Sequence, residues 1–408
     1  MANRTNNDYA MKHIYIFNNA TRAAEYGIGT YINQMLCCLK EVPQLRITLV
    51  NLNTEKTEQT VEEAESVRII QIPIIKYSGT EHNYYRYYRN LLYVLIPYIR
   101  IEEENIFHLN YLHNRPIASL LKREYPSCRI LLTIHYMNWC FTLKGNASLF
   151  KQILSKTKDT RNEQEEEIYQ DFQNDRKLFK EVDRIICLSQ YTCQLLHNMY
   201  SVSDDKTALI YNGLVDEALF LSSNEKEQKK QALLFDKEDK IILFVGRLDE
   251  IKGLDILIKA FRNILHKEPK ARLLVVGDGD FKVYLKEATD VAVRITYTGK
   301  VSKEQLYEYY QIATVGVMPS FHEQCSYVGI EMMMHGIPLI GTDSTGLSEM
   351  VEEECRLHID ENNKSLIIPE ELSDLLSIIL SNSPNNDLRT KYRKRYENNY
   401  SLSAMKTK

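Results

Sequence analysis

Short apolar runs alternate with longer amphipathic segments along almost the whole chain, and this alternation constrains the fold more than any other feature. In the first half the strand-like runs are residues 13–17, 47–50, 67–73, 106–109 and 129–134. Segments with helical spacing separate most of them, and Gly27 to Thr30 opens the first such helix. This pattern is typical of a parallel β-sheet covered on both faces. We therefore expect an α/β fold.

The same pattern starts again in the second half, with strand-like runs at residues 240–245, 272–276, 294–297 and 315–318. A chain of 408 residues favours two or three domains. Asn212-Gly213 is a turn signal, and the polar stretch after it has no core pattern. We place the domains at residues 1–212 and 213–387, with a last helix at about 388–408 that we expect to pack back on the first domain.

Two segments depart from the simple alternation. A helix is expected over residues 81–101, with a kink at Pro97. Its Tyr-Arg-rich part, residues 84–96, is typical either of a helix packed on the sheet or of a membrane interface, and we favour the first. Residues 151–180 are rich in charged side chains, which indicates an exposed helix or a mobile insertion.

Composition excludes several classes of protein. The net charge of −4 and the pI near 6.3 argue against a nucleic-acid binder. No apolar run is long enough to span a membrane or to serve as a signal peptide, and we expect reduced cysteines. The expected location is the cytoplasm, with peripheral contact at the inner membrane face left open.

The stretch from Pro319 to Gly346 carries the most chemistry. Glu323 lies in a loop after a buried strand, and Glu331 lies eight positions later in the helix that follows. The start of that helix offers unpaired backbone N–H groups, which suit a phosphate. One short unit thus combines a candidate phosphate-binding site with two carboxylates that can accept hydrogen bonds from hydroxyls.

Two cations follow the first strand of the second domain. Arg247 and Lys252 lie at the carboxyl end of that strand, where ligands bind in open α/β sheets. Two cations in this position would neutralise a diphosphate and stabilise it as a leaving group. The alternative is a pair of surface cations beside a tight turn, but the glutamate unit in the same half favours the functional interpretation.

The remaining candidates are weaker. Asp278-Gly279-Asp280 resembles a metal-binding pattern, but nearby carboxylates and histidines are missing, so we expect a glycine turn with Asp280 as a helix N-cap and no metal. His135 ends a strand of the first domain, where it could hydrogen-bond a substrate hydroxyl. A single histidine is more often structural, and His108 and His113 are weaker candidates still.

Together these residues resemble the retaining glycosyltransferases of sequence family 4, which have the two-Rossmann-domain GT-B fold. The resemblance rests on Gly246-Arg247-Leu with Lys252-Gly253, on Gly277-Asp-Gly279, and on Glu323 and Glu331 before Gly336-Ile-Pro338. Residues 322–336, with Tyr26-Gly-Ile-Gly-Thr-Tyr31, are similar to a bacterial subgroup associated with the maturation of ribosomally made peptides. The fold implied is GT-B, with two parallel sheets facing across a cleft.

The resemblance implies a role for each site residue. Arg247 and Lys252 would hold the donor diphosphate, and Glu331 the ribose hydroxyls. Glu323 would contact a sugar hydroxyl, and His135 would lie beside the donor sugar at the reacting face. Further donor-binding positions implied by the family are Gly29, Gly277 and Ser326. The usual glycines after the first glutamate are replaced here by Gln324-Cys-Ser326, so the contact next to Glu323 differs from the family pattern.

The function implied is transfer of a sugar from a UDP- or GDP-sugar to an acceptor hydroxyl, with retention and without a metal or other cofactor. The acceptor is a glycan, a lipid-linked glycan or a peptide. Two alternatives stay open. One is a GT-B phosphorylase or a sugar-nucleotide epimerase, and the other is an inactive donor-binding partner subunit.

Overall fold

The chain forms two compact units, each built on one β-sheet. The computed structural model describes residues 11–20, 27–74, 81–360, 367–383 and 385–408, without the side chains of residues 81–84. The first unit comprises residues 1–135, 158–188 and 192–210, and the second comprises residues 136–157, 189–191 and 211–408. Tyr26 lies outside the described residues, and the predicted domain bounds stay a prediction.

The first unit contains an eight-stranded sheet in the order β3-β4-β2-β1-β5-β6-β7-β8. Its strands are β1 (Lys12–Asn19), β2 (Leu45–Thr54), β3 (Thr60–Ala64), β4 (Val67–Pro73), β5 (Glu104–Leu109), β6 (Arg129–Ile134), β7 (Arg184–Cys187) and β8 (Thr207–Leu209). All neighbours are parallel except β3 and β4. Because β1 lies between β2 and β5, the strand order reverses there, and the carboxyl ends of β1 and β5 flank a topological switch point.

The second unit contains a six-stranded parallel sheet in the order β11-β10-β9-β12-β13-β14. Its strands are β9 (Lys240–Val245), β10 (Ala271–Val276), β11 (Ile295–Gly299), β12 (Val315–Met318), β13 (Leu339–Thr342) and β14 (Arg356–Leu357). This is the strand order of a Rossmann sheet, and its switch point lies between β9 and β12. The loops that follow these two strands are those that carry the predicted cations and Glu323.

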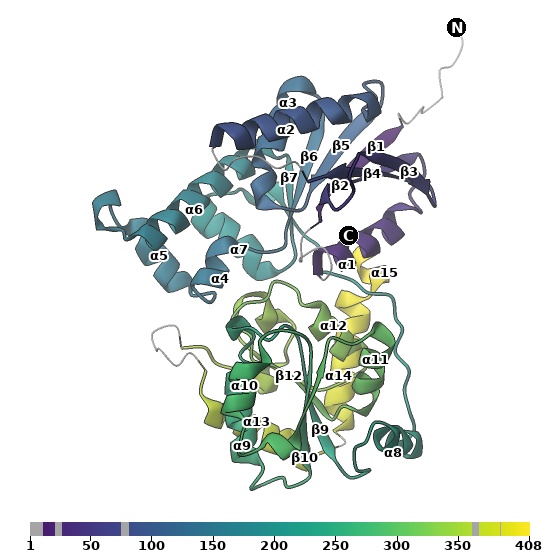
Figure 1. Cartoon of the computed structure of the whole chain (residues 1–408), viewed down its shortest axis with the longest axis vertical. Helices are drawn as coiled ribbons and strands as arrows, with labels where there is room; N and C mark the ends of the chain where they lie inside the picture. Colours follow the sequence, from purple (N-terminus) through teal and green to yellow (C-terminus); the bar gives the residue numbers. More distant parts are fainter. Residues whose placement is uncertain (1–10, 21–26, 75–80, 361–366, 384) are drawn as a thin grey trace. The chain divides into compact units, whose positions relative to one another are not determined.

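Helices cover both sheets. In the first unit they are α1 (Gly27–Leu39), α2 (Glu81–Leu95), α3 (Arg115–Glu124) and α6 (Glu163–Glu181), with most of α7 (Gln190–Tyr200). In the second they are α4 (Asn138–Thr142), α5 (Ala147–Ser155), α8 (Ser223–Ala232), α9 (Leu254–Ile264), α10 (Phe281–Glu287), α11 (Lys303–Ile312), α12 (Tyr327–Met334), α13 (Pro369–Ser381), α14 (Asn386–Arg395) and α15 (Leu402–Lys406). In the second unit α9, α10 and α13 lie on one side of the sheet, and α11, α12 and α14 on the other (Figure 1).

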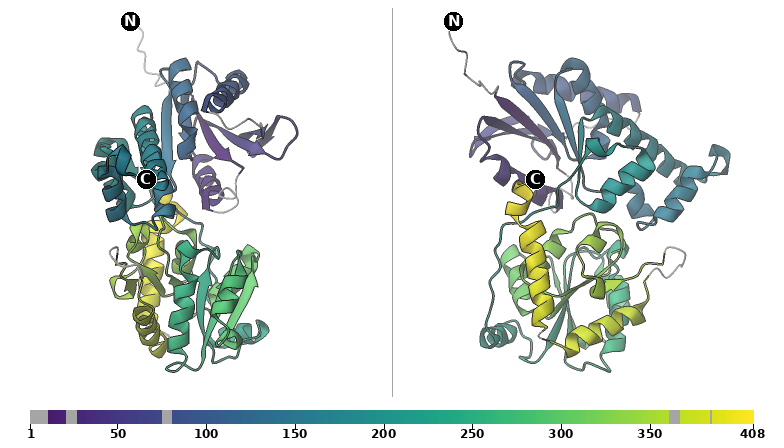
Figure 2. Two further views of the ribbon diagram at one scale, coloured as in Figure 1. Left: turned by 60° about the vertical axis from the view of Figure 1, so that its left-hand side comes forward. Right: turned by 180° about the vertical axis from the view of Figure 1, so that it is seen from behind.

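The C-terminal helices pack within the second unit. α14 continues through a helical turn at Tyr396–Tyr400, and Figure 2 shows it from behind, in yellow, along the face of this unit. Tyr392 donates its hydroxyl proton to the carbonyl of Leu339 in β13 at 2.6 Å, and Tyr396 to the carbonyl of Leu214 at 3.0 Å. These bonds fix the helix against the sheet and against the segment that follows Asn212. Its expected packing on the first domain stays a prediction.

The α/β prediction is confirmed, and several elements have the predicted bounds. α3, β6 and β9 begin and end where the sequence pattern places them. Each unit is a Rossmann-like half built on a mostly parallel sheet, as the expected GT-B fold requires. The eight cysteines form no disulfide, and among the helices described none combines the length and apolar composition that crossing a bilayer requires.

Other expectations are wrong in detail. The helix expected over 81–101 ends at Leu95, and a short 3-10 turn, Ile96–Tyr98, follows, so Pro97 ends the helix instead of kinking it. Residues 151–180 form parts of α5 and α6 instead of one helix, and α6 starts at a capping box made by Asn162 and Glu165. The stretch without a core pattern, residues 221–230, forms most of the exposed helix α8.

Candidate functional site

Three loops meet at the carboxyl edge of the second sheet. They follow β9 (residues 246–253), β10 (277–280) and β12 (319–326). Leu248 forms a bridge to Gly279, and the backbone N–H of Phe321 donates to the carbonyl of Ile251 at 2.8 Å. The loops after β9 and β12 therefore lie against each other, at the switch point where this fold binds its ligands.

Glycine is required at two contacts between these loops. Gly277 has φ of +142°, and a Cβ built on it would lie 1.8 Å from the carbonyl oxygen of Gly246. Gly253 has φ of +67°, and its Cβ would lie 2.2 Å from the carbonyl oxygen of Pro319. Any side chain would push the loops apart. Gly277, a predicted donor-binding residue, thus lets the loop after β10 approach the loop after β9.

Lys252 and Glu323 form an ion pair across the two loops. The Nζ of Lys252 donates to Oε1 of Glu323 at 2.5 Å, and the two side chains are 19% and 12% exposed. An ammonium group has three N–H donors, so Lys252 can keep this bond while it binds a phosphate oxygen. The pair therefore places a cation and a carboxylate side by side at the switch point of the second sheet.

The backbone of Glu323 is held by Thr345, which no sequence signal had singled out. The Oγ1 of Thr345 donates to the carbonyl of Glu323 at 2.6 Å and accepts from its N–H at 3.0 Å. The N–H of Gly346 donates to the same carbonyl at 2.9 Å. Thr345 itself has φ of +39°, a region that β-branched residues rarely adopt. This strained threonine fixes the position of the predicted sugar-contacting loop.

Arg247 lies in the same loop as Lys252 but is more exposed. Its side chain is 40% exposed, and Nη2 lies 3.0 Å from Oδ2 of Asp249. A guanidinium group carries five N–H donors, so this ion pair leaves most of them available. The arrangement suits an anion that reaches this edge from solvent.

The helix α12 starts at this edge and carries Glu331. Ser326 is its N-cap, and its Oγ accepts from the N–H of Gly329 at 3.4 Å, so the predicted donor-binding Ser326 caps the helix with its side chain. Glu331 accepts a hydrogen bond from the hydroxyl of Tyr310 at 2.7 Å. Burial raises the pKa of Glu331 to about 7, although the bond from Tyr310 opposes the shift.

Asp280 of the Asp-Gly-Asp pattern is a helix N-cap, as predicted. The carboxylate of Asp280 caps α10 by accepting from the N–H of Lys282 at 3.1 Å, and Asp278 accepts from the N–H of Gly279 at 2.8 Å. Within the ranges that the structure describes, no group of three or more His, Cys, Asp or Glu side chains is placed to hold a metal ion. Catalysis without a metal remains a prediction.

In the first unit, His135 follows β6 and is held by Asn110, which follows β5. The Nδ2 of Asn110 donates to the carbonyl of Phe17 at 3.0 Å, so its Oδ1 faces His135 Nε2, also at 3.0 Å. His135 Nε2 must then carry the ring proton, and Nδ1 is left with a lone pair. Burial lowers the pKa of His135 to about 3. The ring is therefore a neutral acceptor that suits a hydroxyl donor.

The other first-unit candidates have structural partners. His108 Nε2 lies 2.7 Å from the Oγ1 of Thr133, and burial lowers its pKa to about 4. His113 Nε2 lies 2.6 Å from the Nδ2 of Asn19. Gly29 lies in the first turn of α1, half-exposed. The positions of these three residues neither confirm nor contradict the roles predicted for them.

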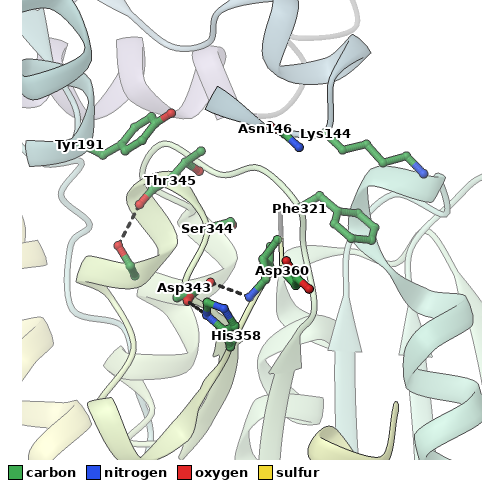
Figure 3. Close-up of a pocket in the computed structure, with 12 residues that line it drawn as sticks. Lys144, Asn146, Tyr191, Phe321, Asp343, Ser344, Thr345, His358 and Asp360 are labelled. Atoms are coloured by element: carbon green, nitrogen blue, oxygen red, sulfur yellow. Dashed lines mark hydrogen bonds and ion pairs between the residues drawn. The ribbon is translucent and has the colours of Figure 1, made fainter. Parts of the chain in front are cut away.

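A cavity of about 430 Å³ lies beside the Glu323 loop, and the sequence did not predict it. Its lining residues all belong to the second unit and come from the segment after α4, the start of α7 and the ends of β12, β13 and β14. Figure 3 shows Asp343, His358 and Asp360 grouped together, with Phe321, Thr345 and Tyr191 around them. Thr345 belongs both to this cavity and to the support of Glu323.

Comparison with known proteins decides the family. The model described as "Glycosyltransferase Family 4" matches residues 27–217, and the model described as "Glycosyl transferases group 1" matches residues 225–399. The two matches together cover almost the whole described chain. The chain belongs to the family 4 glycosyltransferases. The residues of the resemblance, Lys252, Glu323 and Glu331, lie in the second matched region.

Single relatives match shorter parts of this glycosyltransferase chain. An uncharacterized glycosyltransferase of Methanocaldococcus jannaschii is 31% identical over 176 residues, 42% of this chain and 45% of that protein. The chain spans about half the length of the curated relatives it matches.

Solved structures share the fold over nearly the full length. Sucrose-phosphate synthase of Thermosynechococcus elongatus is 20% identical, with a TM-score of 0.74 over 97% of this chain and 96% of that one. HepE of Anabaena, whose structure is a complex with UDP-glucose, is 12% identical, with a TM-score of 0.66 over 97% of each chain. At these identities the likeness shows the GT-B fold of this glycosyltransferase and nothing finer.

Proposed function

We propose that this chain transfers a sugar from a nucleoside-diphosphate sugar to an acceptor hydroxyl, with retention at the anomeric carbon and without a metal. The observation that carries the proposal is the meeting of the Lys252–Glu323 pair with the start of α12 at the switch point of the second sheet. A cation and a helix N-terminus suit a diphosphate, and the adjacent carboxylates suit the hydroxyls of the sugar and the ribose.

Each site residue has a distinct role in the proposed transfer reaction. Lys252 and Arg247 neutralise charge on the departing diphosphate, and the first turn of α12 adds backbone N–H groups. Glu331 accepts hydrogen bonds from the ribose, and Glu323 from the sugar. The neutral ring of His135 accepts from a sugar hydroxyl through Nδ1. The acceptor hydroxyl attacks from the face that the phosphate leaves, and its proton passes to the departing phosphate.

The donor we propose is a UDP- or GDP-sugar. Support comes from HepE of Anabaena, a protein of the same fold whose crystal structure is a complex with UDP-glucose. The acceptor is a glycan, a lipid-linked glycan or a peptide, and membership of the peptide-maturation subgroup belongs to the same proposal. A location in the cytoplasm accords with a soluble donor of this kind.

A labelled donor separates this function from its alternatives. The protein is incubated with nucleotide sugar labelled in the sugar and with mixed acceptors, and the label is followed. We expect the label on an acceptor, with the anomeric configuration of the donor and with undiminished rate in EDTA. Label in an epimerised nucleotide sugar would indicate an epimerase, and label in a sugar 1-phosphate a phosphorylase. Donor binding without any turnover would indicate an inactive partner subunit.

A further inference from the structure

We infer that His322 donates a hydrogen bond to the diphosphate of the donor, and this inference rests on the proposed function. His322 lies in the loop after β12, immediately before Glu323, and none of the roles that the family pattern implies falls on it. The residue is only 5% exposed, although loops usually run over the surface and expose their polar side chains. Its burial beside the predicted sugar-contacting carboxylate therefore requires a physical explanation.

His322 differs from the other buried histidines in its hydrogen bonds. Four histidines are buried in the part of the chain that the structure describes. Both ring nitrogens of His13 are bonded, at 2.8 Å each, and His108 and His335 each use one nitrogen, at 2.7 and 2.9 Å. In His322 no group of the described ranges bonds to either nitrogen. An unpaired buried polar group destabilises a fold, and a ligand that supplies the missing partner accounts for its presence.

The two ring nitrogens of His322 differ in their access to solvent. Nδ1 is sealed inside the protein without a partner, whereas Nε2 is not sealed. Burial lowers the pKa of His322 to about 4, so the ring is neutral and carries one N–H. We expect this proton on Nε2, because a sealed N–H without an acceptor is rarer than a sealed lone pair. Nε2 is then a hydrogen-bond donor that an oxygen of a ligand can reach.

The charges that act on His322 are those of the proposed donor site. After burial, the groups that act on its pKa are Glu323, which raises it, and Lys252, which lowers it. These two side chains form the ion pair at 2.5 Å. A diphosphate bound to Lys252 would therefore present its oxygens close to the imidazole N–H. Phosphate oxygens only accept hydrogen bonds, so a neutral N–H that cannot find an acceptor in the protein suits them.

The ring of His322 is held in place by Phe141 on α4. The two rings pack edge to face, with centroids 5.6 Å apart and planes at 83°. The segment that carries Phe141 is itself seated on the loop after β12, since a Cβ on Gly145 would lie 2.7 Å from the carbonyl oxygen of Phe321. A ring supported in this way keeps its N–H in one direction, which is the arrangement that stabilises a developing anion most effectively.

The test measures binding of UDP, GDP and inorganic pyrophosphate to the full chain by calorimetry. His322→Phe keeps a ring but removes the N–H. We expect it to raise the dissociation constants of pyrophosphate and of the nucleoside diphosphate that binds by about tenfold, the usual effect of losing one hydrogen bond to a charged group. His322→Gln, whose amide N–H can take the place of Nε2–H, should keep most of the affinity.

Thermal stability is the second readout, and it separates binding of a ligand from a structural role. Because His322→Phe removes an unpaired polar group from the interior, the melting temperature should rise by about 2–4 °C. His13→Phe is the matched control, since it makes the same change at a buried histidine whose two nitrogens are bonded. That variant should have a lower melting temperature than the wild type.

Two results would overturn the inference. One is an unchanged dissociation constant of the nucleoside diphosphate in His322→Phe, even where the affinity for UDP-glucose or GDP-mannose falls, since the lost contact would then belong to the sugar. The other is a fall in the melting temperature of His322→Phe like that of His13→Phe, which would show that the polar atoms of the ring stabilise the fold.

Failure of the proposed function gives a different result. If pyrophosphate binds to the wild type and His322→Phe weakens it, but neither UDP nor GDP binds, the anion contact of His322 stands and the nucleotide donor is contradicted. If neither pyrophosphate nor a nucleotide binds to the wild type, the inference and the proposed donor site are both contradicted.

Discussion

The carboxyl edges of the two sheets share a strand order around their switch points but differ in chemistry. In the second unit the edge carries charges, with Lys252 and Glu323 paired at 2.5 Å. In the first unit the equivalent edge carries amides and imidazoles, with Asn110 bonded to His135 at 3.0 Å and Asn19 to His113 at 2.6 Å. Burial lowers the pKa of both histidines, so both rings are neutral.

The difference teaches how one architecture provides two kinds of recognition. Fixed charges and a helix start suit a diphosphate, whose negative charge grows as the sugar leaves. Neutral groups with a defined donor or acceptor suit hydroxyls, which change little in charge during transfer. Under the proposed function, the duplicated topology supplies two edges for ligands, and the residues after a few strands decide what each edge would bind. Four changes would break or sharpen this contrast.

Removing the charge of the second edge should have the largest effect. Lys252→Ala should lower kcat/KM for the donor by about a hundredfold or more, the usual loss when one preorganised donor to a developing anion is deleted. Steady-state kinetics of transfer, or of donor hydrolysis, measures it. Lys259, an exposed lysine on α9 that lies 3.8 Å from Asp255, gives the control variant Lys259→Ala. Equal rates in the two variants would remove Lys252 from the site.

The second-largest effect should come from removing the hydroxyl of Thr345, which holds the backbone of Glu323. Thr345→Val keeps the shape of the side chain but leaves the N–H and the carbonyl of Glu323 without the hydroxyl that bonds both. We expect the free energy of unfolding to fall by about 1–3 kcal/mol, the cost of an unpaired N–H at Glu323, since the carbonyl keeps its bond from Gly346. Urea unfolding measures it, with the exposed Thr390→Val as control. A loss confined to the control position would contradict the role of Thr345.

Charging the first edge should have a pH-dependent effect. Asn110→Asp places a carboxylate opposite His135 Nε2 and should raise the pKa of the ring from about 3 by about one to three units. As the pH falls, the imidazolium forms and Nδ1 ceases to be an acceptor. Activity relative to wild type should therefore fall between pH 8 and pH 5, by up to about tenfold if the pKa rises by three units.

Two further variants serve as controls for the pH dependence of Asn110→Asp. Asn110→Ala should lower activity equally at all pH values, because it leaves His135 without either an amide or a carboxylate. Asn90→Asp makes the same chemical change at an exposed position of α2 and should have no effect. A flat profile for Asn110→Asp would mean that the protonation of His135 does not matter to the reaction.

The smallest effect concerns Glu331. Because burial raises its pKa to about 7, its carboxylate form is lost as the pH falls through 7. Affinity for the nucleotide sugar should fall by about fivefold from pH 8 to pH 6, measured by calorimetry. Tyr310→Phe removes the bond that opposes the shift and should move the midpoint upward, whereas Glu331→Gln should abolish the dependence.

The raised pKa of Glu331 affects stability in the opposite direction to donor affinity: low pH weakens donor binding but favours the folded state. The folded chain binds the proton of Glu331 more tightly than the unfolded chain does, so this group stabilises the fold below its unfolded pKa near 4.5. That contribution is lost as the pH rises from about 4.5 to 7. A free energy of unfolding that responds equally to pH in Glu331→Gln would contradict the assignment.

The sequence was enough for the fold class and for much of the second unit. Apolar runs with clear ends, such as residues 240–245, identify strands because burial on both faces demands them. It missed β3, since Thr60 to Ala64 are mostly exposed and carry two glutamates that hide the strand pattern. It also missed α8, which depends on the capping box of Ser222 and Glu225 instead of an apolar face.

The candidate site residues could be named from the sequence only where a short motif carries them, as for Lys252 and for Glu323. Glu323 and Glu331 belong to a single stretch, whereas Tyr310 and Asn110 support the predicted residues from outside their motifs. Thr345 ends the same stretch as Glu323, but its type and spacing carry no signal of the contact. Asn110 lies 25 residues from His135 in sequence and Thr345 lies 22 residues from Glu323, so no local spacing reveals the contacts. The cavity depends on the ends of three strands and could be recognised only after folding.

The most direct test of the central claim is binding of the donor to the wild-type chain. UDP-, GDP- and ADP-sugars are screened by thermal unfolding, followed by calorimetry of the best one. We predict that one nucleotide sugar, present at 100 times its dissociation constant, stabilises the wild type by about 2.7 kcal/mol. Lys252→Ala should lose most of this stabilisation. If no nucleotide sugar stabilised the wild type, or if Lys252→Ala were stabilised equally, the assigned site would be contradicted.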